Sequence, residues 1–447
     1  MIDYHLQNWK THPLRQPLLL RGARQVGKTH AARELGKTFT HFVEINFEET
    51  ERARAIFDKD LTAKELIIAL EALSQKPIKP QMTLLFLDEI QVAPRALTAL
   101  RYFYEQMPEL HVIAAGSLLD FVLEKVGVPV GRVESLYVYP LSFLEFLAAS
   151  GKTMLLKHFI DHDPSKELST PIHDMLLDEF GRYLALGGMP QVLQCWKETQ
   201  DPLLCTQLQA RIIATYRQDF GKYAKIHQVK YVDLVFDSVP AQIGHKFKYS
   251  EIDGDYRKRE LVPALDLLAL AGVVHKVHYS PGQGIPLGAH ANPKDYKVLF
   301  LDSGLVQQIL EYDLADWFIN PLAEFENKGE LVEGCIGLEF MAYSSPHKKM
   351  RNFYWHREER TSSAEVDYLL QMKNAILPIE VKSGKGSSLK SLNLFIEEHK
   401  KTPYGIKFST NNFERHESYH SYPLYSVSKV LLERDSELQK AIQSLLQ

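Results

Sequence analysis

An octapeptide near the start of the chain has the residue types and spacing of a phosphate-binding loop. It reads Gly22-Ala23-Arg24-Gln25-Val26-Gly27-Lys28-Thr29. In the pattern G-x-x-x-x-G-K-[ST], the amide hydrogens of the loop converge on the phosphates, and glycine permits the backbone angles and the close approach. We expect the whole loop to bind ATP, with Lys28 at the β- and γ-phosphates and Thr29 as a ligand of Mg²⁺.

A second set of polar residues follows two apolar runs and suits nucleotide hydrolysis. The stretch "TLLFLDEIQ", residues 83–91, contains Asp88 and Glu89 at the end of its apolar part. We expect Asp88 to bind Mg²⁺, directly or through water, and Glu89 to polarise the attacking water. Ser117, which ends "HVIAAGS", is expected beside Asp88 as a γ-phosphate sensor, with a simple strand-end turn as the alternative. Arg132 is a candidate arginine finger, with an ordinary surface arginine as the alternative.

Near the C-terminus, carboxylates and a lysine recur at a spacing used in phosphodiester hydrolysis. Asp367 is followed by Glu380-Val-Lys382, whose two charged residues share one face of a strand. An upstream helix supplies a further carboxylate, Glu333 or Glu339. We expect Asp367 and Glu380 to bind Mg²⁺, or alternatively Mn²⁺, for the activation of water, and Lys382 to stabilise developing charge. The alternatives are an ordinary solvated strand face, or a nuclease-like fold kept for binding alone.

A basic triplet opens another helical pattern. It is Arg257-Lys258-Arg259, followed by "ELVPALDLLALAG" and by two strand-like pieces, 273–279 and 296–302, with a long loop between them. Helices followed by such a hairpin fit a winged helix-turn-helix, whose recognition helix presents its N-terminal residues to DNA. We therefore expect the triplet to contact nucleic acid. The alternative is a solvated helix start in a module that only packs or binds protein.

Two histidine patterns are not expected to bind metal. Residues 416–420 read H-E-x-x-H, but the zinc site of that pattern requires a helix, and this stretch lies between strand-like runs, so we expect a polar loop. His275 and His278 are three apart on an expected strand and therefore face opposite sides. Both are interpreted as hairpin residues.

Bulk composition bounds the class of protein. The chain has 447 residues, enough for about three domains, with 45% hydrophobic and 24% charged residues. A formal net charge of −4 leaves nucleic-acid binding to local patches. Three widely spaced cysteines indicate a reducing compartment, and no apolar run suits a signal peptide or a membrane span. We expect a cytoplasmic protein without membrane contact.

The pattern of elements predicts an α/β protein. Apolar runs at 17–22, 41–47, 83–90 and 111–117 alternate with helical patterns, which indicates a parallel sheet covered on both faces. The C-terminal part predicts a helix at 328–344, a helix at 389–400, and strands at 352–357, 364–371, 375–384, 404–410 and 424–428. We predict four parts: a P-loop NTPase core (1–152), a helical lid (153–222), a winged-helix segment (223–318) and a mixed α/β nuclease-like domain (319–447).

Several stretches together resemble a known family. They are "RGARQVGKT", "LLFLDEIQ", "AAGSLLDF", "GRVESLYVYPLSFLEF", "YLALGGMPQVL", "KVLFLDSGLVQQI", "GELVEGCIGLEF" and "EVDYLLQMKNAILPIEVKSG". Across about residues 10–430 the chain resembles prokaryotic AAA-type ATPases with a C-terminal domain of unknown function related to restriction-endonuclease (PD-(D/E)xK) folds. The resemblance implies ATP binding by the loop, magnesium and hydrolysis roles for Asp88 and Glu89, and Glu333 rather than Glu339 as the helix carboxylate. It gives no sharply defined arginine finger.

These patterns predict an ATP-hydrolysing protein coupled to a metal-dependent nuclease-like domain that acts on DNA or RNA. The alternative is a nucleotide-dependent switch whose C-terminal domain binds nucleic acid or protein without cleaving it. AAA-type domains commonly oligomerise, so a homo-oligomer is open. The alternatives differ in whether Glu333, Asp367, Glu380 and Lys382 converge within reach of one metal ion.

Overall fold

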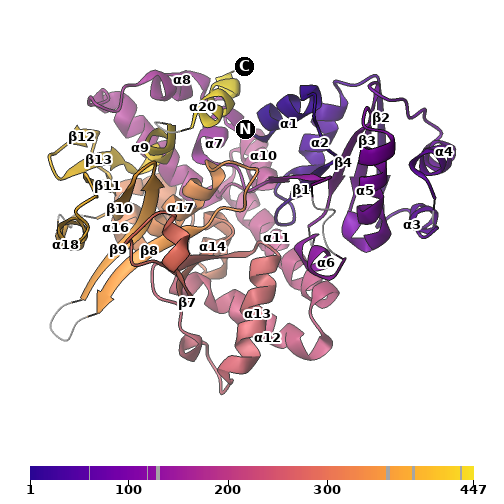
Figure 1. The fold of residues 1–447 in the computed structure, drawn as a ribbon. Helices are drawn as coiled ribbons and strands as arrows, with labels where there is room; N and C mark the ends of the chain where they lie inside the picture. Colours follow the sequence, from indigo (N-terminus) through magenta and orange to yellow (C-terminus); the bar gives the residue numbers. More distant parts are fainter. Residues whose placement is uncertain are drawn as a thin grey trace. The chain divides into compact units, whose positions relative to one another are not determined.

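The computed structural model describes residues 1–59, 61–117, 119–126, 131–358, 363–384, 388–432 and 435–446 (Figure 1). The chain divides into two compact units. The first unit comprises Met1–Tyr139, Leu270–Gly272 and Ser345–Lys349. The second unit comprises Pro140–Ala269, Val273–Ser344 and Met350–Gln447.

The first unit is built on a five-stranded sheet in the order β2-β3-β4-β1-β5, with every neighbouring pair parallel. The strands are β1 (Leu18–Arg21), β2 (His41–Asn46), β3 (Thr83–Asp88), β4 (His111–Ala115) and β5 (Glu134–Tyr137). The predicted parallel sheet is confirmed. Strand β5 was not predicted, because its residues "ESLY" mix polar and apolar types and form no apolar run.

Helices cover both faces of this sheet. They are α1 (Ile2–Thr11), α2 (Lys28–Gly36), α3 (Glu51–Phe57), α4 (Ala63–Ser74), η1 (Ile90–Val92), α5 (Pro94–Gln106) and α6 (Leu119–Val126). Successive residues of β1 point to opposite sides, so that Leu19 packs with α3 to α6 and Leu18 and Leu20 pack with α1 and α2. This two-sided burial explains why the strands are apolar throughout.

The second unit begins with a helical region. Its helices are α7 (Phe143–Ala149), α8 (Thr153–Asp161), α9 (Thr170–Leu186), α10 (Pro190–Thr199), α11 (Pro202–Tyr223), α12 (Ile226–Ser238) and α13 (Lys258–Leu270), with short turns η2 (Pro240–Gln242) and η3 (Tyr249–Glu251). Helix α9 ends at Gly187, whose φ of 76° suits glycine. None of the described helices is long and apolar enough to cross a membrane.

An eight-stranded mixed sheet follows, in the order β12-β13-β11-β10-β9-β8-β6-β7. Its strands are β6 (Val274–Tyr279), β7 (Asn292–Phe300), β8 (Asn352–Glu358), β9 (Ser363–Met372), β10 (Ala375–Lys382), β11 (Gly405–Ser409), β12 (Glu414–Arg415) and β13 (Tyr419–Pro423). The predicted hairpin β6–β7 is present and antiparallel. However, β6 also pairs with β8, so the hairpin forms one end of the C-terminal sheet.

Further helices accompany this sheet: α14 (Ser303–Ile309), α15 (Ala315–Ile319), α16 (Pro321–Asn327), α17 (Gly329–Ala342), α18 (Lys390–Glu398), α19 (Val427–Leu432) and α20 (Ser436–Gln443), with 3₁₀ turns η4 (Leu287–His290), η5 (Leu424–Ser426) and η6 (Ser444–Leu446). The prediction of a strand at 424–428 is wrong, because η5 and the start of α19 occupy these residues. Strand β13 ends at Pro423, which cannot donate a ladder hydrogen bond. The aromatic and β-branched residues that follow it pack as a helix.

Candidate nucleotide and metal sites

The phosphate loop lies between the end of β1 and the start of α2. Gly22 and Gly27 have φ angles of 141° and 100°, which residues other than glycine rarely adopt. A Cβ on Gly22 would lie 2.1 Å from the carbonyl oxygen of Val138, so a larger residue does not fit. Between the two glycines, Ala23 and Val26 are buried, Arg24 and Gln25 are half-buried, and Gln25 has a φ of 63°.

Lys28 lies inside this loop rather than in solvent. Only 7% of the residue is exposed, and its Nζ donates hydrogen bonds to the carbonyl oxygens of Gly22, at 3.0 Å, and Ala23, at 2.6 Å. Burial lowers the pKa of Lys28 to about 8, although Glu89 and Asp88 act in the opposite direction. The loop thus holds an amine where phosphate is expected.

The two predicted magnesium ligands are in direct contact. Thr29 Oγ1 donates to Asp88 Oδ2 at 2.9 Å, and the backbone N–H of Glu89 donates to Asp88 Oδ1 at 2.9 Å. Burial raises the pKa of Asp88. A hydroxyl and a carboxylate at the end of β3 therefore offer hard oxygen ligands of the kind Mg²⁺ prefers.

Gln91 positions Glu89, and we did not predict it. Gln91 Nε2 donates to Glu89 Oε2 at 2.6 Å, and Glu89 itself has a left-handed φ of 51°. The Gln91 side chain also reaches the end of β4, since a Cβ on Gly116 would lie 2.1 Å from Gln91 Oε1. Ser117 follows there and is buried, and its Oγ has no hydrogen-bond partner among the described residues. Gln91 thus links Glu89, after β3, to the end of β4.

Arg132 does not reach the loop of its own chain. It precedes β5, whose Glu134 pairs with Leu18 at the start of β1, whereas the loop follows the end of β1. Its guanidinium Nε contacts Glu105 Oε1 at 2.6 Å. Because β1 and β5 are parallel, Arg132 lies at the end of the sheet opposite the loop in its own chain, and its role as an arginine finger stays a prediction.

A different arginine supports the loop. Arg21, the last residue of β1, pairs with Asp120 of α6 at 2.6 Å, and its guanidinium lies 4.8 Å from the ring centre of Tyr137. Lys349 Nζ lies 3.4 Å from the same Asp120 carboxylate. This half-buried pair ties the start of the loop to α6. The signal available in the sequence was an arginine directly before the loop.

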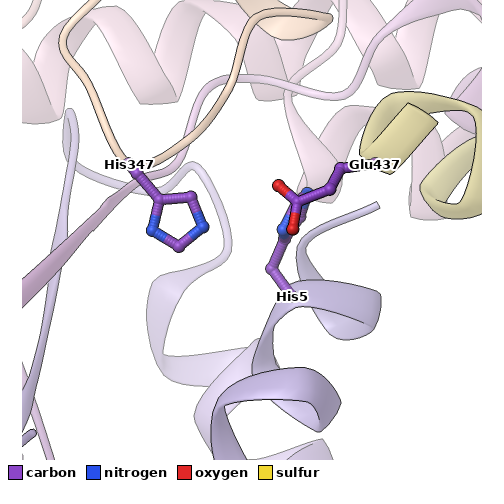
Figure 2. A group of neighbouring side chains, drawn as sticks. All are labelled: His5, His347 and Glu437. Atoms are coloured by element: carbon purple, nitrogen blue, oxygen red, sulfur yellow. The ribbon is translucent and has the colours of Figure 1, made fainter. Parts of the chain in front are cut away.

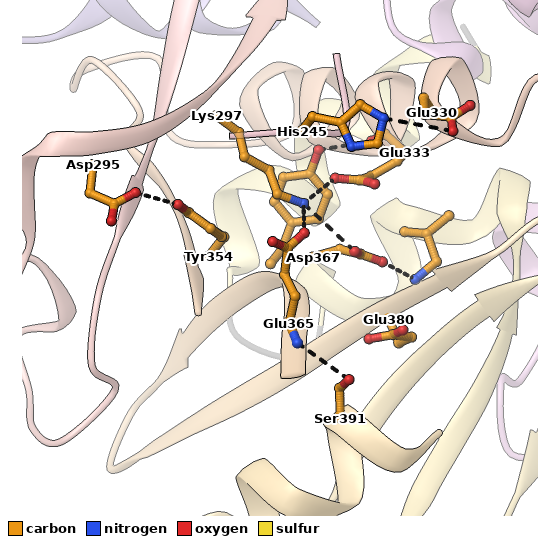
Figure 3. A network of polar contacts seen from close by, with 12 residues as sticks. His245, Asp295, Lys297, Glu330, Glu333, Tyr354, Glu365, Asp367, Glu380 and Ser391 are labelled. Carbon is orange, nitrogen blue, oxygen red and sulfur yellow. Dashed lines mark hydrogen bonds and ion pairs between the residues drawn. The ribbon is translucent and has the colours of Figure 1, made fainter. Parts of the chain in front are cut away.

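The C-terminal carboxylates lie close together in the second unit (Figure 3). Glu333 comes from α17, Asp367 from β9, and Glu380 and Lys382 from β10. Asp367 Oδ2 accepts a hydrogen bond from the N–H of Val381 at 2.8 Å, and Lys382 Nζ lies 2.5 Å from Glu380 Oε1. Glu380 Oε2 is buried and has no hydrogen-bond partner in the part of the chain that the structure describes. Glu339, the alternative helix carboxylate, instead accepts from the Phe143 N–H and the Tyr183 hydroxyl.

Lys297 of β7 lies among these carboxylates, and we did not predict it. Its Nζ is 2.9 Å from Glu333 Oε1, 2.5 Å from Glu365 Oε1 and 3.9 Å from Asp367 Oδ1 (Figure 3). Only 2% of Lys297 is exposed. Its ammonium therefore supplies positive charge to Glu333, which is largely buried, and to Glu365, whose side chain is 43% exposed.

Burial dominates the electrostatics of this cluster. It raises the pKa of Glu333 to about 8 and of Glu380 to about 7, and Asp367 adds to both shifts through its like charge. The pKa of Asp367 is also raised by burial. Burial alone lowers the pKa of Lys297, but the carboxylates of Glu333, Asp367 and Glu365 outweigh it and raise the pKa.

The residues fit a divalent cation only in part. Asp367, which is partly buried, and Glu380, which is buried, come from the neighbouring strands β9 and β10, and Glu380 Oε2 has no hydrogen-bond partner among the described residues. Glu333 does not complete the set, because it pairs with Lys297. Among the described residues of the second unit, no three Asp, Glu, His or Cys ligand atoms lie within 4.8 Å of one another. The predicted convergence of all three carboxylates on one ion is thus absent from this arrangement.

The remaining candidates are placed as follows. The triplet Arg257-Lys258-Arg259 is exposed at the start of α13. The H-E-x-x-H stretch is not helical: His416 pairs with Glu414 at 3.1 Å, and His420 lies in β13, so that part of the expected loop is a strand. Both histidines of 275–278 lie in β6, as predicted.

Figure 2 shows His5 and His347 of the first unit, whose rings meet edge to face with centroids 5.9 Å apart. His347 Nδ1 also lies 3.0 Å from Glu134 Oε1. Glu437, the third residue drawn, belongs to the second unit. We assign no metal site to these residues.

Three family models match the chain. Residues 14–147 match the AAA domain, residues 177–316 match a domain of unknown function (DUF8612), and residues 328–427 match another (DUF4143). The chain therefore contains an AAA-family ATPase domain followed by two domains of unknown function. This confirms the AAA part of the resemblance and the presence of a C-terminal domain of unknown function.

Solved structures add only distant similarities. The Aeropyrum pernix ORC2 protein is 12% identical over 69% of this chain and 88% of its own, with a TM-score of 0.31. Drosophila ORC bound to DNA (14% identity, 69% and 84% covered) and the A. pernix ORC1 protein in complex with DNA (14%, 72% and 93%) both have TM-scores of 0.27. Such low scores carry neither fold nor function to this chain. No curated protein matches it.

Proposed function

We propose that the first unit binds ATP with Mg²⁺ and hydrolyses it, and that this reaction controls a second unit that acts on nucleic acid. The observation that carries the proposal is the contact of Thr29 with Asp88 beside the buried Lys28. The test is phosphate release by the purified chain with ATP and Mg²⁺, with and without single- and double-stranded DNA and RNA. Absence of both release and nucleotide binding would contradict it.

Each residue has a chemical part in this proposed reaction. The Lys28 ammonium stabilises charge on the β- and γ-phosphates, and the loop amides bind the same oxygens. Thr29 and Asp88 would hold Mg²⁺, which neutralises phosphate charge when it is bound. Glu89 orients the attacking water, and Gln91 keeps the Glu89 carboxylate in place through its hydrogen bond. Ser117 offers to the γ-phosphate a hydroxyl that has no partner among the residues the structure describes.

For the second unit we infer a restriction-endonuclease-like domain that contains Asp367, Glu380 and Lys382, preceded by a winged-helix segment at 223–318. Support comes from the adjacent buried carboxylates and the Glu380–Lys382 pair. Asp367 and Glu380 would hold Mg²⁺ or Mn²⁺, and Lys382 would stabilise charge on the phosphate. The division at 1–152, 153–222, 223–318 and 319–447 and a homo-oligomeric state remain predictions.

The second candidate function is a nucleotide-dependent switch without cleavage. One observation favours it: Lys297 pairs with Glu333, so an internal ammonium partly neutralises the cluster that a metal ion would otherwise neutralise. In this case ATP binding and hydrolysis would change the shape of the protein and its affinity for nucleic acid.

Replacing Asp367 separates the two candidates. Asp367→Ala is expected to eliminate Mg²⁺-dependent cleavage of nucleic acid and to leave ATP hydrolysis in the first unit largely unchanged. The reason is that Asp367 is one of the two carboxylates adjacent in the cluster, whereas ATP is bound by other residues. Both activities are measured on the same preparation, with Mg²⁺ and Mn²⁺.

Two further variants make this result interpretable. Asp367→Asn keeps the shape and an acceptor for the Val381 N–H, so it guards against loss of folding. Asp316→Ala removes an exposed aspartate of α15 and serves as the matched control. Cleavage that persists in Asp367→Asn would assign the nuclease to another protein in the preparation or to another site. Absence of cleavage in the unmodified chain would favour the switch.

A further inference from the structure

A basic and aromatic cavity lies on the second unit, away from the carboxylates of the metal site. Its volume is about 840 Å³. It is lined by side chains of the segment before α13, of α13 itself and of the hairpin β6–β7: Lys246, Phe247, Lys248, Tyr249, Ser250, Tyr256, Lys258, Val262, Asp266, Lys276, Pro293, Lys294 and Tyr296. On β7, Lys294 and Tyr296 alternate with Asp295 and Lys297, so the cavity and the carboxylate cluster are on opposite faces of the strand.

The lining of the cavity is rich in lysine: five of its residues are lysines and one, Asp266, is acidic. Three of these lysines are paired with carboxylates, Lys276 with Asp266 at 2.7 Å, Lys246 with Asp295 at 2.8 Å and Lys248 with Glu251 at 2.9 Å. Lys258 and Lys294 have no carboxylate partner within 4.0 Å among the described residues, and both are exposed. The cavity therefore favours an anion, although the chain as a whole is slightly acidic.

Aromatic rings form one wall of the same cavity. Phe247 stacks with Tyr296 at a centroid distance of 6.2 Å, and Tyr249 meets Phe247 edge to face at 5.0 Å. The hydroxyls of Tyr249 and Tyr296 are 2.7 Å apart, which fixes both rings. Lys258 Nζ lies 5.5 Å from the centre of the Tyr249 ring. A half-buried ring beside a cation can hold a flat aromatic ligand that carries a phosphate.

We propose that this cavity binds single-stranded nucleic acid, with a base against Tyr249 and phosphates at Lys258 and Lys294. Stacking requires an exposed base face, and a duplex hides its base faces. A recognition helix in a major groove would instead use all three residues of the triplet at 257–259, of which only Lys258 lines the cavity. This inference rests on the proposed nucleic-acid function for the class of ligand, but not on ATP hydrolysis or cleavage.

The test compares four labelled 20-mers by fluorescence anisotropy: oligo-dT, oligo-U, an abasic strand of equal charge, and a blunt duplex. We expect oligo-dT or oligo-U to bind about tenfold more tightly than the abasic strand, the gain of one stacked base. Tyr249→Leu should reduce that affinity to the abasic level, and Tyr249→Phe, which keeps the ring, should retain it. A preference for DNA or RNA would show in the first two probes.

Lysine variants test the phosphate contacts. Lys294→Ala is expected to weaken the binding of the abasic strand and of oligo-dT equally. It should also reduce the slope of log affinity against log salt concentration by about 0.7, the contribution of one phosphate contact on a single strand. Lys157→Ala, an exposed lysine of α8 outside the cavity, is the control and should change neither. Folding of each variant is checked by its thermal melting.

Two outcomes would overturn the proposal. One is equal binding of oligo-dT, oligo-U and the abasic strand by the unmodified chain. The other is unchanged oligo-dT binding by a folded Tyr249→Leu variant. If the preference for strands with bases is present but the chain neither hydrolyses ATP nor cleaves nucleic acid, the inference about the cavity holds and the proposed function is wrong. If ATP is hydrolysed but neither oligo-dT nor oligo-U binds more tightly than the abasic strand, the proposed function holds and the inference about the cavity is wrong.

Discussion

Lys28→Ala is expected to abolish ATP hydrolysis and to weaken nucleotide binding. The Lys28 ammonium is buried in the loop and already bonded to two backbone carbonyl oxygens, so it is positioned before any phosphate arrives. Removing one positioned donor from a developing negative charge typically lowers kcat by about 100-fold or more. The measurement is phosphate release at saturating ATP and Mg²⁺, together with nucleotide affinity by calorimetry.

The matched control is a lysine at the other end of the same helix. Lys37 follows α2, is exposed and pairs with Glu34 at 2.6 Å, so Lys37→Ala should leave turnover unchanged. Thermal melting separates loss of chemistry from loss of folding. Normal turnover by a folded Lys28→Ala variant would remove the loop from the mechanism.

The parallel sheet of the first unit could be predicted because each predicted strand is an apolar run. Strands buried on both faces carry this signal along their whole length, as Leu84 to Leu87 of β3 do. Strand β5 lacks it, because only Leu136 of its four residues is buried. Near the C-terminus the sequence predicts a strand that is absent. The stretch "LYSVS" has strand-forming residues, but Pro423 before it ends the ladder and a helix follows.

In the candidate sites, too, some side-chain contacts could be predicted from the sequence and others could not. The contact of Thr29 with Asp88 follows from two motifs whose places in a parallel sheet are fixed. Lys297 could not be placed in that way, because helix α17 brings Glu333 to it and strands distant in the sequence bring Asp367 to it. A signal was nevertheless present: a single lysine within the apolar run "YKVLFLD" must find a buried counter-charge.

Lys297→Met is expected to destabilise the second unit by about 3–5 kcal/mol, the usual loss when one partner of a buried ion pair is removed. The variant keeps an apolar stem of similar length but leaves the carboxylates of Glu333, Glu365 and Asp367 without their ammonium. Urea unfolding followed by tryptophan fluorescence and circular dichroism measures the change. Lys373→Met, an exposed lysine between β9 and β10, is the control and should change stability little.

A double variant and added metal then decide what the ammonium does. Lys297→Met combined with Glu333→Gln should recover part of the lost stability, because one of the unpaired charges is gone. If Mg²⁺ or Mn²⁺ stabilises Lys297→Met more than the unmodified chain, a divalent ion can replace the ammonium, and the cluster retains the capacity of a metal site. If neither ion does so while the loss of stability is observed, Lys297 is the permanent cation of the cluster, and the switch without cleavage becomes the better account. A loss below about 1 kcal/mol would contradict a buried pairing, because exposed surface pairs contribute about 0–1 kcal/mol.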